Sequence, residues 1–401
     1  MKNKNPFFMY RFRLQNFIKK QTLFWVGMLT LGILSYLMIV STSSLWAVPT
    51  IQNSQSSENL DRVQPKPAAI GKPPVLLGLY TNGYAGAQNI IDRELHQVDE
   101  WATKKHAIVG MFMDIQGDNP SYNIGHRLEI LRDNGYTAFI NLKSTRLASE
   151  IARGDLDNDL RKVASAVADW TKKGEGRMMF IAPLQEMNIA GESYSLDPEN
   201  FKLSYKRIQQ IFSEFDMPTK SVRWVFSPNG FSRVRNQDFE NYYPQDAQVD
   251  ILGFSGYNWG YCSSPLNQRN LWDRPESAYG VYIKRMQKLA PNKPIFITQI
   301  ASSSYNKPHN SSGAAKQKWL YDSYQYLAAA PSVQAIIYFN IEKECDWALD
   351  TENQNLTESY PSIVANQVFG YVAPRDMLEV VNSLTDVSES RPNKPIQKVV
   401  N

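Results

Sequence analysis

The stretch MMFIAPLQEMN, residues 178–188, joins a short apolar run to a single acidic side chain, Glu186. The first six residues are continuously apolar rather than alternating, which is typical of a strand buried on both faces. Glu186 follows this run between Gln185 and Asn188. General acid–base chemistry that uses a carboxyl group in this way often needs a second carboxylate close by.

Seven further apolar runs of the same kind lie on either side of this stretch. They are VLLGLY (75–80), AIVGMFMDI (107–115), TAFINLK (137–143), VRWVFSP (222–228), VDILGFSGY (249–257), PIFITQI (294–300) and VQAIIYFNI (333–341). Segments with helical spacing of apolar residues separate several of them, at 157–173, 203–215, 278–290 and 314–330. This alternation predicts an α/β fold, a (β/α)8 TIM barrel. An open doubly wound sheet is the alternative, but no glycine-rich phosphate-binding motif follows the first run.

The N-terminus has the features of a membrane anchor. Residues 1–22 carry six lysine or arginine residues and no acid, and residues 23–40 are free of charge. Eighteen residues of helix span about 27 Å, close to the roughly 30 Å hydrocarbon core. We expect an uncleaved anchor, with a cleavable signal peptide as the alternative. The basic flank predicts a cytoplasmic N-terminus and an extracytoplasmic barrel, which would be secreted if the signal were cleaved.

The expected domain organisation follows from these segments. Residues 1–22 form a basic cytoplasmic tail, 23–40 the anchor, 41–72 a disordered linker rich in Pro, Ser, Gln and Asn, 73–375 the barrel and 376–401 a C-terminal tail. A short helix is expected at 376–384 within that tail. The formal charge of +4 belongs to the basic tail, because the remainder is about −2, which argues against nucleic acid as a partner. The four histidines lack metal-ligand spacing, so no metal or other cofactor is expected.

Barrel enzymes place their chemistry at the C-terminal ends of the strands. In chain order these positions hold Tyr80, Asp114, Lys143, Glu186, Asn229, Tyr257, Gln299 and Asn340, and aromatic residues follow at Tyr84, Trp259, Tyr261, Trp272 and Trp347. Aromatic rings stack on the C–H faces of sugars and amides bond sugar hydroxyls, so the expected partner is a polysaccharide or oligosaccharide. The alternative is that the aromatic residues only pack the loops.

Five motifs resemble family 26 of the glycoside hydrolases, which contains the β-mannanases and belongs to the clan of (β/α)8 retaining glycosidases. They are PLQEMN (183–188), WVFSPN (224–229), YYPQDAQVDILGFSGYNW (242–259), KPIFITQ (293–299) and YFNIEKECDW (338–347). The resemblance covers about residues 178–350, with the motifs in the family's order. It implies a glycoside hydrolase-like domain that acts on, or binds, a β-linked mannan or glucan, and an endo-β-mannanase-like reaction if the domain is active.

The resemblance also implies roles for single residues. Glu186 matches the general acid/base, which protonates the glycosidic oxygen and then deprotonates the incoming water. Tyr257 matches the tyrosine that bonds the nucleophile, and Trp347 matches an aromatic residue of the sugar-binding wall. The further expected contacts of the saccharide are Gln185, which stands where the family usually has histidine, Asn188, Asn229, Trp259, Tyr80 and Asp114.

The family's nucleophile position, KPIxxxE, holds Gln299 in this chain. A retaining reaction needs two carboxyl groups about 5–5.5 Å apart, one of which forms a glycosyl ester. An amide is a poor nucleophile, and it also removes the negative neighbour that would help to keep Glu186 protonated.

Four accounts of this amide stay open. Another carboxylate, from Asp114, Glu342 or Asp346, can supply the second function, and a base about 6.5–9.5 Å away would give an inverting hydrolase. An N-acetyl sugar can use its own acetamido oxygen as nucleophile, oriented by Gln299. The barrel can instead be a catalytically inactive pseudoenzyme that binds sugar in exopolysaccharide assembly. An engineered exchange of glutamate for glutamine is the fourth account, and the intact tail and anchor argue against it.

The chain has two cysteines, Cys262 and Cys345, which follow the sixth and eighth expected strands. The two loops rise from the same face of the barrel, and thiols outside the membrane are free to pair. We expect a disulfide that ties this rim and holds Trp259 and Trp347, with two buried thiols as the alternative.

Overall fold

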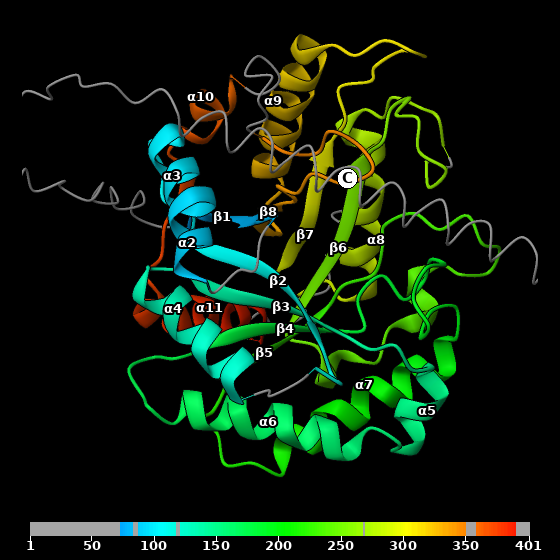
Figure 1. Ribbon diagram of the computed structural model, residues 1–401. Helices are drawn as coiled ribbons and strands as arrows, with labels where there is room; N and C mark the ends of the chain where they lie inside the picture. The colour runs from blue at the N-terminus through cyan, green and yellow to red at the C-terminus, as the bar shows by residue number, and fades with distance from the viewer. Residues whose placement is uncertain (1–72, 83–86, 118–120, 268, 350–357, 390–401) are drawn as a thin grey trace, which may run out of the picture. The chain divides into compact units, whose positions relative to one another are not determined.

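The computed structural model describes residues 73–82, 87–117, 121–267, 269–349 and 358–389 (Figure 1). The chain divides into two units, residues 1–60 and 61–401, and every described residue belongs to the second. The basic tail, the expected anchor at 23–40, the linker and Tyr84 lie outside the described residues. Within the described ranges, no helix has both the length and the apolar character needed to cross a bilayer.

The strands form one parallel sheet that closes on itself (Figure 1). They are β1 (Val75–Tyr80), β2 (Ile108–Asp114), β3 (Thr137–Lys143), β4 (Met179–Pro183), β5 (Val222–Phe226), β6 (Ile251–Asn258), β7 (Ile295–Ser302) and β8 (Val333–Tyr338). Each pairs with the next, and β1 pairs with both β2 and β8, which closes the ring. The short β9 (Phe369–Gly370) pairs with the start of β1. The predicted eight-stranded TIM barrel is therefore confirmed.

The continuous apolar runs form strands because both of their faces are covered. Side chains of β1 and β7 are buried along the whole strand. Phe180 of β4 and Phe296 of β7 meet edge to face at 5.2 Å, although their strands are not neighbours in the sheet, so this contact crosses the barrel interior. Burial of one such side chain stabilises the fold by about 2–3 kcal/mol. The interior is thus a packed core, and the site lies above it.

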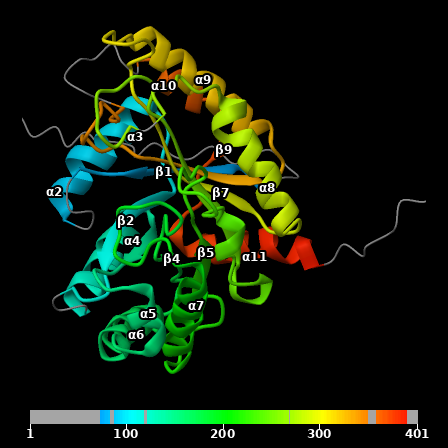
Figure 2. The ribbon, with the colours of Figure 1, turned by 90° about the vertical axis from the view of Figure 1, so that its right-hand side faces the viewer.

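Helices surround the barrel on its outer side (Figures 1 and 2). The α-helices are α2 (Gln88–Ile90), α3 (Gln97–Ala102), α4 (Arg127–Asp133), α5 (Ala148–Arg153), α6 (Asp157–Thr171), α7 (Pro198–Ser213), α8 (Val281–Leu289), α9 (Gly313–Ala329), α10 (Tyr360–Val364) and α11 (Pro374–Glu389). Wider π-helical turns, η1 (Ile91–His96), η2 (Ser121–His126) and η5 (Glu276–Gly280), precede α3, α4 and α8. The helices expected at 157–173, 203–215, 278–290 and 314–330 are all present.

Two of these units differ from the regular pattern. Helix α7 begins at Pro198, before the expected residue 203, because Asp197 caps it by accepting a hydrogen bond from the Asn200 amide at 3.2 Å. Between β5 and β6, residues 227–250 contain only the short 3₁₀ turns η3 (Phe239–Tyr242) and η4 (Asp246–Gln248) and no α-helix. The segment after β5 is therefore free to form a long loop beside the site.

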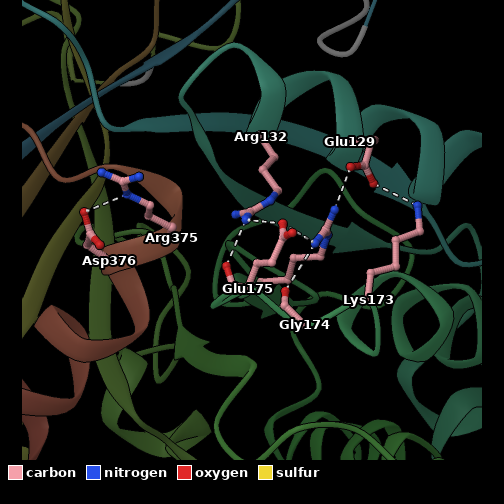
Figure 3. A network of polar contacts seen from close by, with 8 residues as sticks. Glu129, Arg132, Lys173, Gly174, Glu175, Arg375 and Asp376 are labelled. Atoms are coloured by element: carbon pink, nitrogen blue, oxygen red, sulfur yellow. Dashed lines mark hydrogen bonds and ion pairs between the residues drawn. The ribbon is translucent and has the colours of Figure 1, made fainter.

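An ion-pair network holds the turn that leads into β4 (Figure 3). Arg177 bonds Glu129 of α4 at 2.8 Å and Glu175 at 3.0 Å, and Arg132 also bonds Glu175, at 3.1 Å. Lys173 adds a contact to Glu129 at 2.9 Å. The network joins α4 to the start of the strand that carries the segment with Glu186.

Helix α11 closes the N-terminal end of the barrel beside β4 and β5. It is longer than the expected helix at 376–384 and buries Met377 and Val381. Arg223 of β5, itself buried, bonds Asn382 of α11. Gly176, at a positive φ of 67°, lies so close to the Arg375 carbonyl that a Cβ atom there would collide with it. The packed region thus extends beyond residue 375.

Candidate functional site

The backbone around Glu186 is held in an uncommon conformation. Leu184 and Glu186 have positive φ angles of 52° and 54°, in the left-handed region that side chains other than glycine rarely adopt. The Glu186 amide donates to the Ser227 carbonyl at 2.9 Å, and the Tyr194 hydroxyl donates to the Gln185 carbonyl at 3.1 Å. Strain of this kind is found at functional sites, where the surrounding contacts maintain it.

The carboxylate of Glu186 is bonded on one side only. Its Oε1 accepts from the Ser255 hydroxyl at 2.5 Å and from the Asn229 amide at 2.9 Å. Asn229 is fixed in turn by Asn188, because each donates to the other, at 2.8 and 2.9 Å. The second oxygen, Oε2, accepts no hydrogen bond from the described residues, and the side chain is half-buried. One oxygen of a firmly held carboxyl group is therefore open to a ligand.

Burial raises the pKa of Glu186 above the ordinary value of a glutamate. The hydrogen bonds from Ser255 and Asn229 and the charge of Lys343 oppose this rise, and the charge of Glu192 adds to it. A carboxyl group with a raised pKa stays protonated to higher pH, as a general acid must.

Glu186→Gln is expected to remove a pH dependence of the protein's stability. Because the folded-state pKa lies above the unfolded one, the folded chain binds more protons in that interval, and its free energy of unfolding falls as the pH rises through it. The loss is about 1.4 kcal/mol for each pKa unit of displacement. Urea unfolding between pH 4 and pH 8 measures it.

The matched control for this experiment is Glu199→Gln, at an exposed position on α7. Its stability is expected to follow the wild-type pH profile. Parallel profiles for the wild type and Glu186→Gln would show that Glu186 titrates normally and would contradict the prediction.

Gln299 is the middle member of a hydrogen-bonded chain with Tyr257 and Gln185. Its Oε1 accepts from the Tyr257 hydroxyl, and its Nε2 donates to Oε1 of Gln185 at 2.8 Å. Gln299 and Gln185 are buried, with 2% and 4% of their surface exposed, whereas Tyr257 is half-buried. Burial raises the pKa of Tyr257 far above the ordinary tyrosine value, so its hydroxyl stays a donor. The amide at 299 thus has a partner at each end.

The strand geometry around Gln299 is irregular. The pairing of β7 with β8 shifts register between Ile297 and Ile300, and that of β6 with β7 shifts between Phe254 and Ser255. Ser255 then pairs with Gln299 in β7 and with Asn229 after β5. Such bulges occur beside active sites, where they re-aim side chains. Here they bring the partners of Glu186 and Gln299 to the same end of the barrel.

Tyr80 and Asp114 differ in their access to solvent. Tyr80 is buried; its hydroxyl donates to the Thr298 carbonyl at 3.1 Å and accepts from Asn141 at 2.8 Å. Its ring stacks on Phe112 with 5.4 Å between centroids, and Phe112 is partly exposed at the end of β2. Asp114 is exposed and accepts from the Gln116 amide at 3.3 Å. Of this group, Phe112 and Asp114 can meet a ligand directly.

The aromatic residues at the ends of β6 and β8 form one cluster. Trp347 lies perpendicular to Trp259 at 4.9 Å and contacts Tyr257 at 5.4 Å. Trp347 has no exposed surface, whereas Trp259 is half-buried. The expectation that Trp347 itself forms the sugar-facing wall is therefore revised: it supports Trp259 and Tyr257 from behind.

The loop that carries Trp347 is fixed from two sides. Cys345 and Cys262 are joined by a disulfide, with their Cα atoms 6.1 Å apart. The ammonium group of Lys316 donates to the carbonyls of Asp346 and, at 3.0 Å, Ala348. Burial lowers the pKa of Lys316 to about 8, against the opposing charge of Asp346. These contacts restrain the residues on either side of Trp347.

The three carboxylates expected as a second catalytic group occupy different positions. Both oxygens of Asp346 accept from the Ser304 amide, at 3.1 and 3.2 Å, so this side chain holds two loops together. Glu342 is exposed, and its backbone amide donates to Asn82. Asp114 differs from these two because its charge acts on the same group as the charge of Glu186. Burial raises the pKa of the Tyr194 hydroxyl, and the charges of Glu192, Glu186 and Asp114 raise it further. Glu192, which pairs with Lys143 at 2.5 Å, is an additional carboxylate of this region.

The remaining strand-end residues have structural contacts. Asn340 is buried, and its Oδ1 accepts from the Leu349 amide at 2.7 Å. The Tyr261 amide donates to the Tyr305 carbonyl at 2.7 Å, and Trp272 lies beside Gly260.

Sequence reasoning missed Ser255, Phe112 and Glu192. Two of them follow a signal that is present in the chain: residues two apart on a strand face the same side, so Ser255 accompanies Tyr257 and Phe112 accompanies Asp114. Glu192 lies in the loop after β4, where no period places a side chain.

Solved structures with a similar fold include family 26 endo-β-mannanases. The catalytic domain of a Bacillus sp. JAMB-750 endo-β-1,4-mannanase is 13% identical over 74% of this chain and 87% of its own, with a TM-score of 0.55. A β-mannanase from a symbiotic protist of the termite Reticulitermes speratus, solved with a gluco-manno-oligosaccharide, is 13% identical over 76% and 90%, with a TM-score of 0.51. The family 26 domain of a Prevotella bryantii endo-β-mannanase/endo-β-glucanase is 15% identical over 76% and 92%, with a TM-score of 0.50.

No family model matches the chain. The likeness to these mannanases is one of fold, a closed parallel barrel with surrounding helices.

Proposed function

We propose that this protein binds a β-linked polysaccharide of the mannan or glucan type at the C-terminal end of its barrel and does not cleave it. The fold shared with family 26 mannanases supports the class of ligand. Glu186, Asn229, Tyr257 and Trp259 are the residues that contact the saccharide, because each combines a polar or aromatic group with partial exposure. These residues are held in place by Gln185, Asn188, Tyr80 and Trp347. The exposed Asp114 lies at the edge of the site and can also contact the saccharide.

The observation that carries the proposal is the state of Gln299. In the retaining mechanism, the group at this position attacks the anomeric carbon and forms an ester. Gln299 is neutral, and its amide is satisfied on one side by Tyr257 and on the other by Gln185. A buried amide with both ends bonded matches a site built around glutamine, and it offers neither a nucleophile nor a charge to stabilise an oxocarbenium-like transition state. Glu186 then serves as a hydrogen-bonding group for the glycosidic oxygen or a neighbouring hydroxyl.

A second candidate function is hydrolysis with a more distant base. This function is favoured by the grouping of three carboxylates around the Tyr194 hydroxyl. The charges of Glu192, Glu186 and Asp114 all raise the pKa of that hydroxyl. Glu186 would protonate the leaving oxygen while Asp114 or Glu192 activates a water molecule on the opposite face of the sugar.

We also propose an extracytoplasmic location, with residues 23–40 as the anchor. The disulfide between Cys262 and Cys345 supports it, because such bonds persist in oxidising compartments.

Native electrophoresis in gels that contain β-mannan, glucomannan or β-glucan tests the proposal, together with mass spectrometry of the incubated polysaccharide. The full chain is expected to be retarded by at least one polymer and to release no product. Trp259→Ala is expected to weaken binding about tenfold through the loss of stacking area. Leu203→Ala, an exposed apolar position on α7, is the matched control and should bind as the wild type does.

Three outcomes would contradict the proposal. Product release that Glu186→Gln abolishes would establish hydrolysis with a distant base. Cleavage confined to polysaccharides of 2-acetamido sugars would establish substrate assistance. The absence of retardation by any of the polymers would remove the polysaccharide as a ligand.

A further inference from the structure

A cavity of about 660 Å³ lies on the flank of the barrel, outside the site described above. One wall is the segment from Trp272 to Glu276, which links β6 to α8, and the other is α9. The two walls are in contact, because Tyr279 of η5 and Trp319 of α9 lie 5.9 Å apart and the Trp319 indole donates to the Asp273 carbonyl at 2.7 Å. The volume is within the roughly 300–1,000 Å³ typical of ligand pockets.

Helix α9 presents one face to this cavity. Lys318, Tyr321, Asp322 and Gln325 all line it, and their spacing of three and four residues places them on a single stripe. Tyr321 has 52% of its surface exposed, although a large aromatic side chain gains by burial. The face therefore offers an aromatic ring flanked by an amide and an ion pair, Lys318 with Asp322 at 2.7 Å.

The charges around the cavity balance once Arg269 is counted. The lining holds two cations, Arg274 and Lys318, and three carboxylates, Asp273, Glu276 and Asp322, and Arg269 outside the lining pairs with Asp273. The cavity therefore favours neither an anion nor a cation. Asp273 lies within the loop wall with 3% of its surface exposed; its Oδ2 pairs with Arg269 at 2.8 Å, and its Oδ1 is buried without a hydrogen-bond partner among the described residues. Aromatic rings with many donors and acceptors but no net charge suit a neutral polyhydroxyl ligand.

The cavity and the barrel-end site share one loop. The segment 259–273 begins with Trp259, which packs on Trp347, and ends with Trp272, which lines the cavity. Gly260 and Leu271 pair across this segment, and Cys262 anchors it through the disulfide. Residues of this one loop therefore belong to both places, Trp259 to the barrel-end site and Trp272 to the cavity.

We propose that this cavity is a second saccharide-binding site, which takes a neutral segment of the β-linked polysaccharide by stacking on Tyr321 and Trp272. The class of sugar in this inference rests on the proposed function, whereas the location of the second site rests on the cavity alone. Two sites on one chain raise the affinity for a long polymer through effective concentration, without new contacts at either site.

Calorimetric titration of the full chain with a β-1,4-linked gluco-manno-oligosaccharide tests this inference. The wild type is expected to bind two molecules per chain. Tyr321→Ala/Gln325→Ala, on the exposed stripe of α9, is expected to bind one, and Trp259→Ala is expected to weaken the barrel-end site about tenfold and to leave the flank site unchanged. Val281→Ala, an exposed position on α8 outside the cavity, is the control and should bind two.

The outcomes separate the two proposals. A stoichiometry that is the same for the wild type and Tyr321→Ala/Gln325→Ala overturns the flank site, and if Trp259→Ala alone weakens binding, the barrel-end site stands. Binding that is lost with Tyr321→Ala/Gln325→Ala but unaffected by Trp259→Ala supports the flank site and overturns the barrel-end proposal. The absence of any binding overturns both.

Discussion

Gln299→Glu is expected to create hydrolysis of β-linked mannan or glucan, which we propose that the natural chain does not carry out. The change replaces an amide by a carboxylate of the same shape, at the position where a retaining enzyme forms its glycosyl ester. The Tyr257 hydroxyl already points to Oε1 of residue 299 and would donate to the carboxylate without moving. Gln185 needs only to turn its amide so that its NH₂ group faces the new oxygen.

The new carboxylate would also act on Glu186. A negative neighbour disfavours ionisation, so the pKa of Glu186, already raised by burial, should rise further. Nucleophile and general acid then act together, and we expect turnover at least about 10³-fold above the wild-type background, because each type of catalysis contributes factors of this order. Reducing-sugar release and mass spectrometry of the products measure it.

The control is Gln299→Glu/Glu186→Gln, which keeps the new carboxylate and removes the acid. It should be inactive and should still bind polysaccharide, because the glutamine at 186 keeps a group that can form hydrogen bonds. If Gln299→Glu binds the polymer but cleaves none, the amide is not what prevents hydrolysis, and the mechanistic part of the proposal is wrong.

Cys262→Ser/Cys345→Ser is expected to cost about 4 kcal/mol of the free energy of unfolding. The disulfide joins residues 83 apart in sequence, and a cross-link over that length removes a large part of the unfolded chain's entropy. Because the bond also anchors the loops of Trp259 and Trp347, the variant should bind polysaccharide more weakly. Urea unfolding followed by tryptophan fluorescence measures the first effect.

A reducing agent provides the internal control for that variant. Dithiothreitol should destabilise the wild type and leave Cys262→Ser/Cys345→Ser unchanged. Equal urea midpoints for the wild type and the variant without reductant would show that Lys316 and the packing of Trp347 are sufficient to hold the rim, and would contradict the prediction.

The barrel was predictable because a parallel strand that is buried on both faces appears in the sequence as a short continuous apolar run. TAFINLK matches β3 from Thr137 to Lys143, and the other strands end within a few residues of their apolar runs. The prediction of the helices was less complete than that of the strands, because the π-helical turns at Ile91–His96 and Ser121–His126 interrupt the 3.6-residue spacing. The start of α7 was readable from Asp197 and Pro198, which are a cap and a first-turn proline.

The site was predictable in its residue types and less so in its contacts. Glu186, Gln299 and Tyr257 were identified by motif resemblance, and the structure brings them to one end of the barrel. The partners of Glu186 depend on the bulge at Phe254/Ser255, which no sequence period reveals. Trp347 is buried by tertiary contacts with Tyr257 and Trp259, and Lys316 holds the residues on either side of it, none of which a sequence pattern reveals.

The most direct test of the account is a crystal structure of the natural chain with a β-1,4-linked gluco-manno-oligosaccharide. We expect an intact oligosaccharide at the C-terminal end of the barrel, with one ring on Trp259 and a sugar oxygen about 2.6–3.2 Å from Oε2 of Glu186. A cleaved product there, or a barrel end without sugar in crystals that hold the oligosaccharide elsewhere, would contradict it.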